Sequence, residues 1–117
     1  AILTDEITKA WSGMTTRQYK NLKGLKKENL RDNMSTTEII LNMLAETSTR
    51  DISASEKPNG FSESVQIARQ GGEVAGIARK ALEQRTGTSV ITPKNAAQLN
   101  SIVTKTIETI TEQEQKK

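Results

Sequence analysis

Hydrophobic residues recur along most of the chain at intervals of three and four, the spacing that places them on one face of an α-helix. This pattern predicts helices over residues 35–57, 61–86 and about 94–112. A shorter hydrophobic stripe over residues 1–12 and a lysine-rich segment over residues 15–34 have the same spacing. The pattern therefore predicts a chain that is helical over most of its length.

Capping and turn residues bound these predicted helices. Ser35 and Glu38 have the spacing of a capping box, in which each side chain accepts a hydrogen bond from the other residue's backbone N–H. Pro58 and the Asn-Gly pair after it predict a turn, and Gly87 is a typical helix stop. Only residues 88–92 favour an extended conformation. The sequence predicts an all-α fold, a small bundle of four or five helices with at most one short extended segment.

Three glycines, Gly71, Gly72 and Gly76, interrupt the helix predicted over residues 61–86. A glycine inside a helix costs ~1 kcal/mol relative to alanine, so three of them need a reason. They could form a nest of backbone N–H groups that holds a phosphate. They could instead kink the helix, or allow a second helix to cross it closely. Their spacing matches neither a P-loop nor a dinucleotide-binding fingerprint, which favours the packing interpretation.

The composition excludes several classes of chemistry. The chain has no cysteine and no histidine, which excludes disulfides, thiol nucleophiles, histidine acid–base catalysis and the usual zinc sites. Carboxylates are spread over separate segments, and nothing predicts the burial that would make one a general acid or base. We therefore expect a non-enzymatic protein without cofactor, metal or small-molecule substrate. We see no signal peptide and no apolar run near the ~18 residues of a membrane span, so we expect a cytoplasmic protein.

The length of 117 residues fits a single domain. Aromatic residues make up only 3% of the chain, which argues against a β-sandwich or barrel. The sequence starts with Ala-Ile-Leu, in the middle of a hydrophobic pattern and without an initiator methionine. We interpret residues 1–117 as one helical domain from the C-terminal part of a longer protein.

A row of basic residues is the clearest charge feature of a chain whose formal net charge is +3. Between residues 17 and 32, six cations are opposed by only two acidic residues. If the segment were one continuous helix, four of these cations would share a face. Rows of cations bind phosphate backbones through Coulomb attraction and the release of counterions. The candidate nucleic-acid-binding residues are Arg17, Lys20, Lys23, Lys26, Lys27 and Arg31.

The basic row has alternative interpretations. A solvated lysine-rich surface has the same composition, and Gly24 can break the row. Trp11 and Tyr19 lie beside it and could stack on bases, although such rare aromatic residues are more typical of a core. Apolar stripes left uncovered in a small helical protein also tend to pack on a second copy or another helix. The basic row would then serve only as a solubilising surface.

Several runs of residues match a known family. They are residues 11–14 (WSGM), 24–34 (GLKKENLRDNM), 41–46 (LNMLAE) and 68–72 (ARQGG). These runs resemble the C-terminal part of the DNA-damage-inducible protein D family, and the resemblance covers about residues 3–97. Past Leu99 it fades into a generic helical sequence.

The resemblance implies a bacterial protein of the SOS response to DNA damage. The N-terminal half of that family is similar to the DNA-binding domains of phage antirepressors, and the family supplies no site residues to carry over. We expect this chain to bind single-stranded or duplex DNA, or a recombinase–DNA filament, through its basic face. The alternative is a helical protein–protein interaction or homo-oligomerisation module, with DNA binding in the preceding half.

Overall fold

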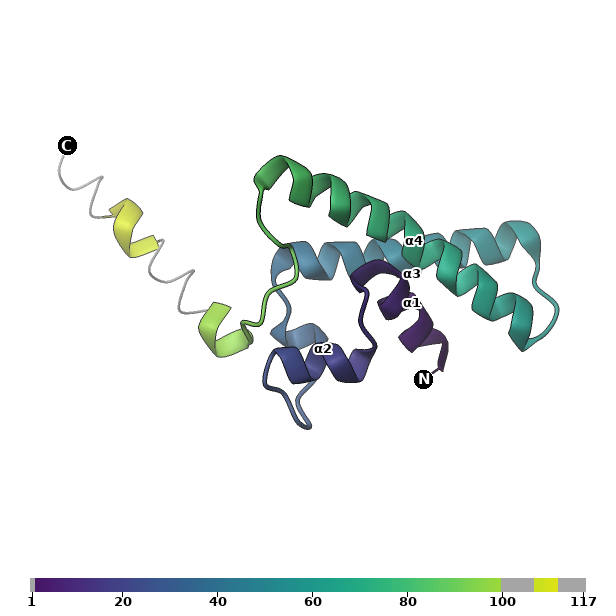
Figure 1. Ribbon diagram of the computed structural model, residues 1–117, viewed down its shortest axis with the longest axis horizontal. Coiled ribbons are helices and arrows are strands. Elements are labelled where there is room, and N and C mark those ends of the chain that lie inside the picture. The colour runs from purple at the N-terminus through teal and green to yellow at the C-terminus, as the bar shows by residue number, and fades with distance from the viewer. Residues whose placement is uncertain (1, 100–106, 112–117) are drawn as a thin grey trace.

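A computed structural model describes residues 2–99 and 107–111, which form helices joined by turns, with no strand among them (Figure 1). The all-α prediction is confirmed. Within the helix predicted over about 94–112, residues 96–99 and 107–111 are helical and residues 94–95 are not. Residues 100–106 and 112 of that prediction lie outside the described residues. The main elements are α1 (Ile2–Ser12), α2 (Thr16–Leu22), the 3₁₀ turn η1 (Arg31–Asn33), α3 (Thr36–Glu56) and α4 (Phe61–Thr86).

Helices α3 and α4 run antiparallel as a long hairpin (Figure 1). Their bounds agree with the helices predicted over residues 35–57 and 61–86. The predicted capping box is present at the start of α3, since Glu38 N–H donates to Ser35 Oγ and Ser35 N–H donates to Glu38 Oε1, at 3.2 and 2.9 Å. The hairpin turn uses two left-handed positions, Lys57 at φ 51° and Gly60 at φ 87°.

The three glycines of α4 allow α3 and α1 to approach its backbone closely. A Cβ added at Gly71 would lie 2.5 Å from the backbone nitrogen of Thr49 on α3. A Cβ added at Gly72 would lie 2.5 Å from the Cβ of Ala10 on α1. Because both glycines are buried within a regular helix, the packing interpretation is confirmed and they form no phosphate nest.

The core lies where α1, α2 and the hairpin meet. Trp11 and Tyr19 are both 0% exposed, and their rings are 6.0 Å apart between centroids. Leu41, Ala45 and Ala75 join this buried cluster from the two long helices, and Met34 joins it from the segment before α3. Both aromatic residues therefore belong to the core, and neither presents a ring to solvent for base stacking.

The segment after α4 returns across the core towards α2. Val90 and Ile91 pack against the buried cluster, and the Val90 N–H donates to the carboxylate of Glu83 at 3.0 Å. Further along, the Ala96 N–H donates to Asn33 Oδ1 at 2.9 Å. The extended run predicted near residues 88–92 consists of bends and pairs with no strand within the described part of the chain.

The basic helical segment predicted over residues 15–34 is not one continuous helix, and the alternative of a break at Gly24 is the one that the structure shows. Helix α2 ends at Leu22, and Gly24 adopts φ +71°, a left-handed conformation that ends the helix. Residues 25–30 are irregular before η1 begins at Arg31. Because the helical register stops at this point, the spacing of three and four no longer keeps the cations on one face.

Candidate nucleic-acid interface

Three of the predicted cations line one surface pocket, which we call the basic pocket. Arg17 and Lys20 come from α2, and Lys26 comes from the irregular turn that follows. The pocket has a volume of about 430 Å³. Its remaining lining residues belong to α1 and the first turn of α2 and are Thr4, Asp5 and Thr16.

Local contacts fix α2 so that one side is buried and the other faces the pocket. Thr15 and Gln18 form a capping box at its start, with N···O distances of 2.9 and 3.2 Å. Tyr19 anchors the helix in the core. The neighbouring Arg17 is exposed and Lys20 is partly exposed, so both can reach solvent.

The chain reversal after α2 brings Lys26 back towards Lys20. Gly24 provides the left-handed turn, and the Leu25 N–H then donates to the Lys20 carbonyl at 2.9 Å. Leu25 is buried and holds this turn against the protein. The Lys26 N–H donates to Glu28 Oε2 at 2.7 Å, and this hydrogen bond lowers the pKa of the exposed Glu28 carboxyl.

The basic pocket carries an excess of positive charge. Its lining has three cationic side chains and one carboxylate, that of Asp5, so its formal charge is +2. Asp5 Oδ1 accepts a hydrogen bond from the Thr16 N–H at 3.3 Å, which ties α1 to the start of α2. The Thr16 hydroxyl oxygen is buried and has no hydrogen-bond partner within the described residues. This arrangement is suited to binding an anion.

Lys23 lies away from the basic pocket, and its expected place on an exposed face is corrected. Its side chain is 0% exposed, and its Nζ lies 3.0 Å from Glu38 Oε1. The same ammonium donates to the Lys94 carbonyl at 2.6 Å, and Glu38 also accepts a hydrogen bond from the Tyr19 hydroxyl. Lys23 follows Tyr19 by four residues, so it shares the side of α2 that faces the core.

The two other predicted cations do not line the basic pocket. Lys27 is exposed in the turn beside Lys26. The guanidinium of Arg31 instead pairs with Glu46 on α3 at 2.5 Å, and Glu46 also accepts from the Asn42 side chain. The structure thus brings three of the six predicted cations together in the basic pocket. Of the other three, Lys23 is buried, Arg31 is paired with Glu46, and Lys27 is exposed beside the pocket.

Sequence reasoning missed the contribution of α1 to this site. Asp5 and Thr16 are distant in sequence from Lys26, yet all three line the same pocket. The buried partner of Lys23 was also missed, because Glu38 was assigned only a capping role. A signal was available, since the spacing of four residues between Tyr19 and Lys23 places both side chains on one face of a helix.

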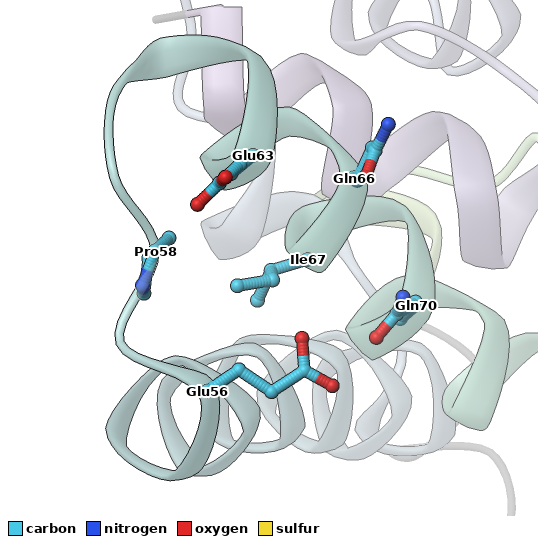
Figure 2. A pocket seen from close by; sticks show the side chains of 6 residues that line it. All are labelled: Glu56, Pro58, Glu63, Gln66, Ile67 and Gln70. Carbon is cyan, nitrogen blue, oxygen red and sulfur yellow. The ribbon is translucent and has the colours of Figure 1, made fainter.

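A different pocket, of about 290 Å³, lies at the turn of the α3–α4 hairpin. Figure 2 shows Ile67 projecting into the space between Glu56 and Pro58, whereas Gln66 points away from it. Glu63 Oε2 accepts a hydrogen bond from the Asn59 N–H at 2.5 Å, so its carboxylate stabilises the turn. This pocket combines acidic groups with an apolar floor and is unsuited to phosphate.

A third pocket lies between α1 and α4 and is lined by Glu6, Lys9, Ala10, Arg69 and Glu73. The Arg69 guanidinium lies 3.0 Å from the Glu6 carboxylate and lowers the pKa of that carboxyl. Its two cations face two carboxylates, so the lining is neutral overall. Of the three pockets, the basic pocket is the one whose charge favours an anion.

Within residues 2–99 and 107–111, no helix is both long and apolar enough to cross a membrane. The same residues contain no cluster of three acidic side chains able to hold a metal ion. No protein-family model matches this sequence, and no curated protein or solved structure is significantly similar to it.

Proposed function

We propose that this chain is a non-enzymatic nucleic-acid-binding protein that contacts phosphate groups through the basic pocket, with Lys27 beside it. The observation that supports this proposal most directly is the convergence of Arg17, Lys20 and Lys26 on one surface pocket. They come from two segments that a left-handed turn at Gly24 brings together. A row of cations on an isolated, solvated helix would lack this convergence.

The chemistry of the lining fits phosphate. An arginine guanidinium can donate two parallel hydrogen bonds to phosphate oxygens, and lysine ammonium groups add charge and further donors. With two to three phosphate charges neutralised by the three cations, the logarithm of affinity should fall with the logarithm of salt concentration at a slope of about 2 to 3. Such a slope is readily measured, and it makes the proposal quantitative.

The biological role that we propose follows from the sequence resemblance described above. A chain similar to DNA-damage-inducible protein D would act in the bacterial response to DNA damage. Its partner would be DNA or a recombinase–DNA filament, either of which presents phosphates on its surface. Binding through a pocket of +2 formal charge suits both partners.

The test is fluorescence anisotropy of labelled single-stranded and duplex DNA at several salt concentrations. We expect the wild-type chain to bind with the slope given above. The triple variant Arg17→Gln, Lys20→Gln, Lys26→Gln should lower that slope by about 2 to 3 and weaken binding at low salt. Circular dichroism of the variant should be unchanged, because the replaced side chains are not part of the core.

A matched control removes the same charge elsewhere. Arg50, Lys80 and Arg85 are exposed on α3 and α4 and line none of the pockets described above. Their simultaneous replacement by glutamine should leave the salt slope nearly unchanged. Equal losses in the two variants, or no binding by the wild type at low salt, would refute the assignment to the basic pocket.

A second candidate function is self-association or docking of a helical partner. Apolar residues at helical spacing stay exposed on both long helices, including Ile40 and Met43 on α3 and Val74 and Ile77 on α4. Replacing Leu82 or Ile107 with asparagine should then lower the sedimentation coefficient at high protein concentration. A sedimentation coefficient that does not depend on concentration in the wild type would remove self-association from consideration.

A further inference from the structure

We infer that the basic pocket selects a phosphate monoester, such as the terminal phosphate of a nucleic-acid strand, over the diesters within a strand. This inference rests on the proposed function and specifies which phosphate the pocket recognises. The lining charge carries the first part of the argument. Arg17, Lys20 and Lys26 are opposed only by Asp5, which leaves a formal charge of +2. A monoester carries about −1.5 to −2 at neutral pH, so it matches this charge better than a diester with −1.

The arrangement of the lining carries the second part. Residues from α1, from α2 and from the turn at Lys26 line an open depression of about 430 Å³. A terminal phosphate continues into the strand through only one ester oxygen, so all its other oxygens can face these donors. An internal phosphate continues in two directions and keeps both of its ester oxygens away from them. A monoester also presents three terminal oxygens to the donors, whereas a diester presents two.

The Thr16 hydroxyl supplies the third part. Buried hydroxyl groups in folded proteins nearly always have a hydrogen-bond partner. The Thr16 Oγ1 has none within the described residues, although Thr16 lines the basic pocket. Because Thr16 lines the basic pocket, an oxygen of a bound monoester can supply the acceptor that this O–H lacks.

The experiment compares two single-stranded oligonucleotides of identical sequence, one with a 5′-phosphate and one with a 5′-hydroxyl, each labelled at its 3′ end. We expect the phosphorylated strand to bind about tenfold more tightly at pH 7.5, the effect of one additional charge-assisted hydrogen bond. The preference should shrink at pH 5.5, because the second pKa of a phosphate monoester is about 6. The variant Thr16→Val should reduce the preference while the weaker binding of the hydroxyl strand is retained.

Competition identifies the source of the monoester. Displacement of the phosphorylated strand by inorganic phosphate would show that the anion alone suffices. Displacement by a nucleoside 5′-monophosphate but not by phosphate would show that the attached nucleoside contributes, and either result supports the inference. Equal binding of the two strands with a normal salt slope would overturn the inference and leave the proposed function intact. Failure of both strands to bind would remove the proposed function as well.

Discussion

The buried ion pair between Lys23 and Glu38 gives the sharpest test of how this fold is held together. Both side chains are 0% exposed, and their charged atoms are 3.0 Å apart. Glu38 also accepts hydrogen bonds from the Tyr19 hydroxyl and from the Ser35 N–H. The carboxylate is therefore surrounded by donors, and within the described part of the chain the ammonium has one other acceptor, the Lys94 carbonyl.

The perturbation is Glu38→Gln, which keeps the size of the side chain and removes its charge. It leaves the Lys23 ammonium buried without an anion, a change that costs about 3 to 5 kcal/mol in comparable sites. A domain of this size has a total stability of about 5 to 15 kcal/mol, so the loss is a large fraction of it. We expect the variant to be folded but much more sensitive to urea.

The double variant Lys23→Met, Glu38→Met separates the charge effect from packing. Replacing both partners with apolar residues of similar volume is often neutral or stabilising, because neither charge is then desolvated. The Tyr19 hydroxyl and the Ser35 N–H would both lose their acceptor. The buried hydroxyl accounts for about 1 to 3 kcal/mol, and Tyr19→Phe in the same background should recover that part. We therefore expect the triple variant to be more stable than Glu38→Gln alone.

The assay is urea unfolding followed by circular dichroism at 222 nm, analysed by linear extrapolation. A cost below about 1 kcal/mol for Glu38→Gln would be typical of an exposed pair and would refute the burial argument. Strict additivity in the double-mutant cycle of Lys23 and Glu38 would refute their coupling. Either result would show that the pair is solvated in solution.

Three other predictions concern the helix crossing, the connector after α4 and the basic turn. Gly71→Ala should destabilise the protein by about 1 to 3 kcal/mol in urea unfolding, because the new Cβ would overlap the Thr49 backbone, although alanine is the better helix former. The hydrogen bond from the Val90 N–H is the main cause that lowers the pKa of the Glu83 carboxyl in the folded protein. This contact therefore stabilises the fold at a pH above the unfolded-state pKa of Glu83. The stabilisation is lost as the pH falls through the lower folded-state pKa. Thermal unfolding should therefore show that Glu83→Gln lowers Tm at pH 6.5 and that this loss of Tm shrinks as the pH is lowered below the unfolded-state pKa. In anisotropy titrations, Lys26→Gln should reduce the salt slope by about 1 and Lys27→Gln by less, because only Lys26 lines the pocket.

The helices were largely predictable because their signals are local. The capping box at Ser35 and the stop at Gly87 depend on neighbouring residues only, and α3 and α4 begin and end within a residue of the predicted bounds. That another helix crosses α4 closely at its glycines was also predictable, since glycines inside a helix need a packing reason. Which helices cross there was not predictable, because nothing in the sequence around Gly72 indicates a contact with Ala10.

The basic site was predictable only in part because its geometry depends on where a short helix stops. The left-handed turn at Gly24 ends the helix and brings Lys26 back beside Lys20, which the helical spacing does not predict. Lys23 follows Tyr19 by four residues and lies with it on the core side of α2. A buried lysine requires an anionic partner, and Glu38 was visible in the sequence only as a cap. Long-range pairing between two charged side chains leaves no periodic signal.

The shortness of α2 has a consequence for the motions of the protein. A helix of seven residues is unstable on its own in water, so α2 depends on the burial of Tyr19 and Lys23 for its existence. Local opening of α2 would have to expose the Lys23–Glu38 pair and release the contact to Lys94. The amide hydrogens next to Tyr19 and Lys23 should therefore exchange with solvent more slowly than those of the exposed first turn of α2. The positions of Arg17 and Lys20 in the basic pocket thus depend on the two side chains buried beneath them.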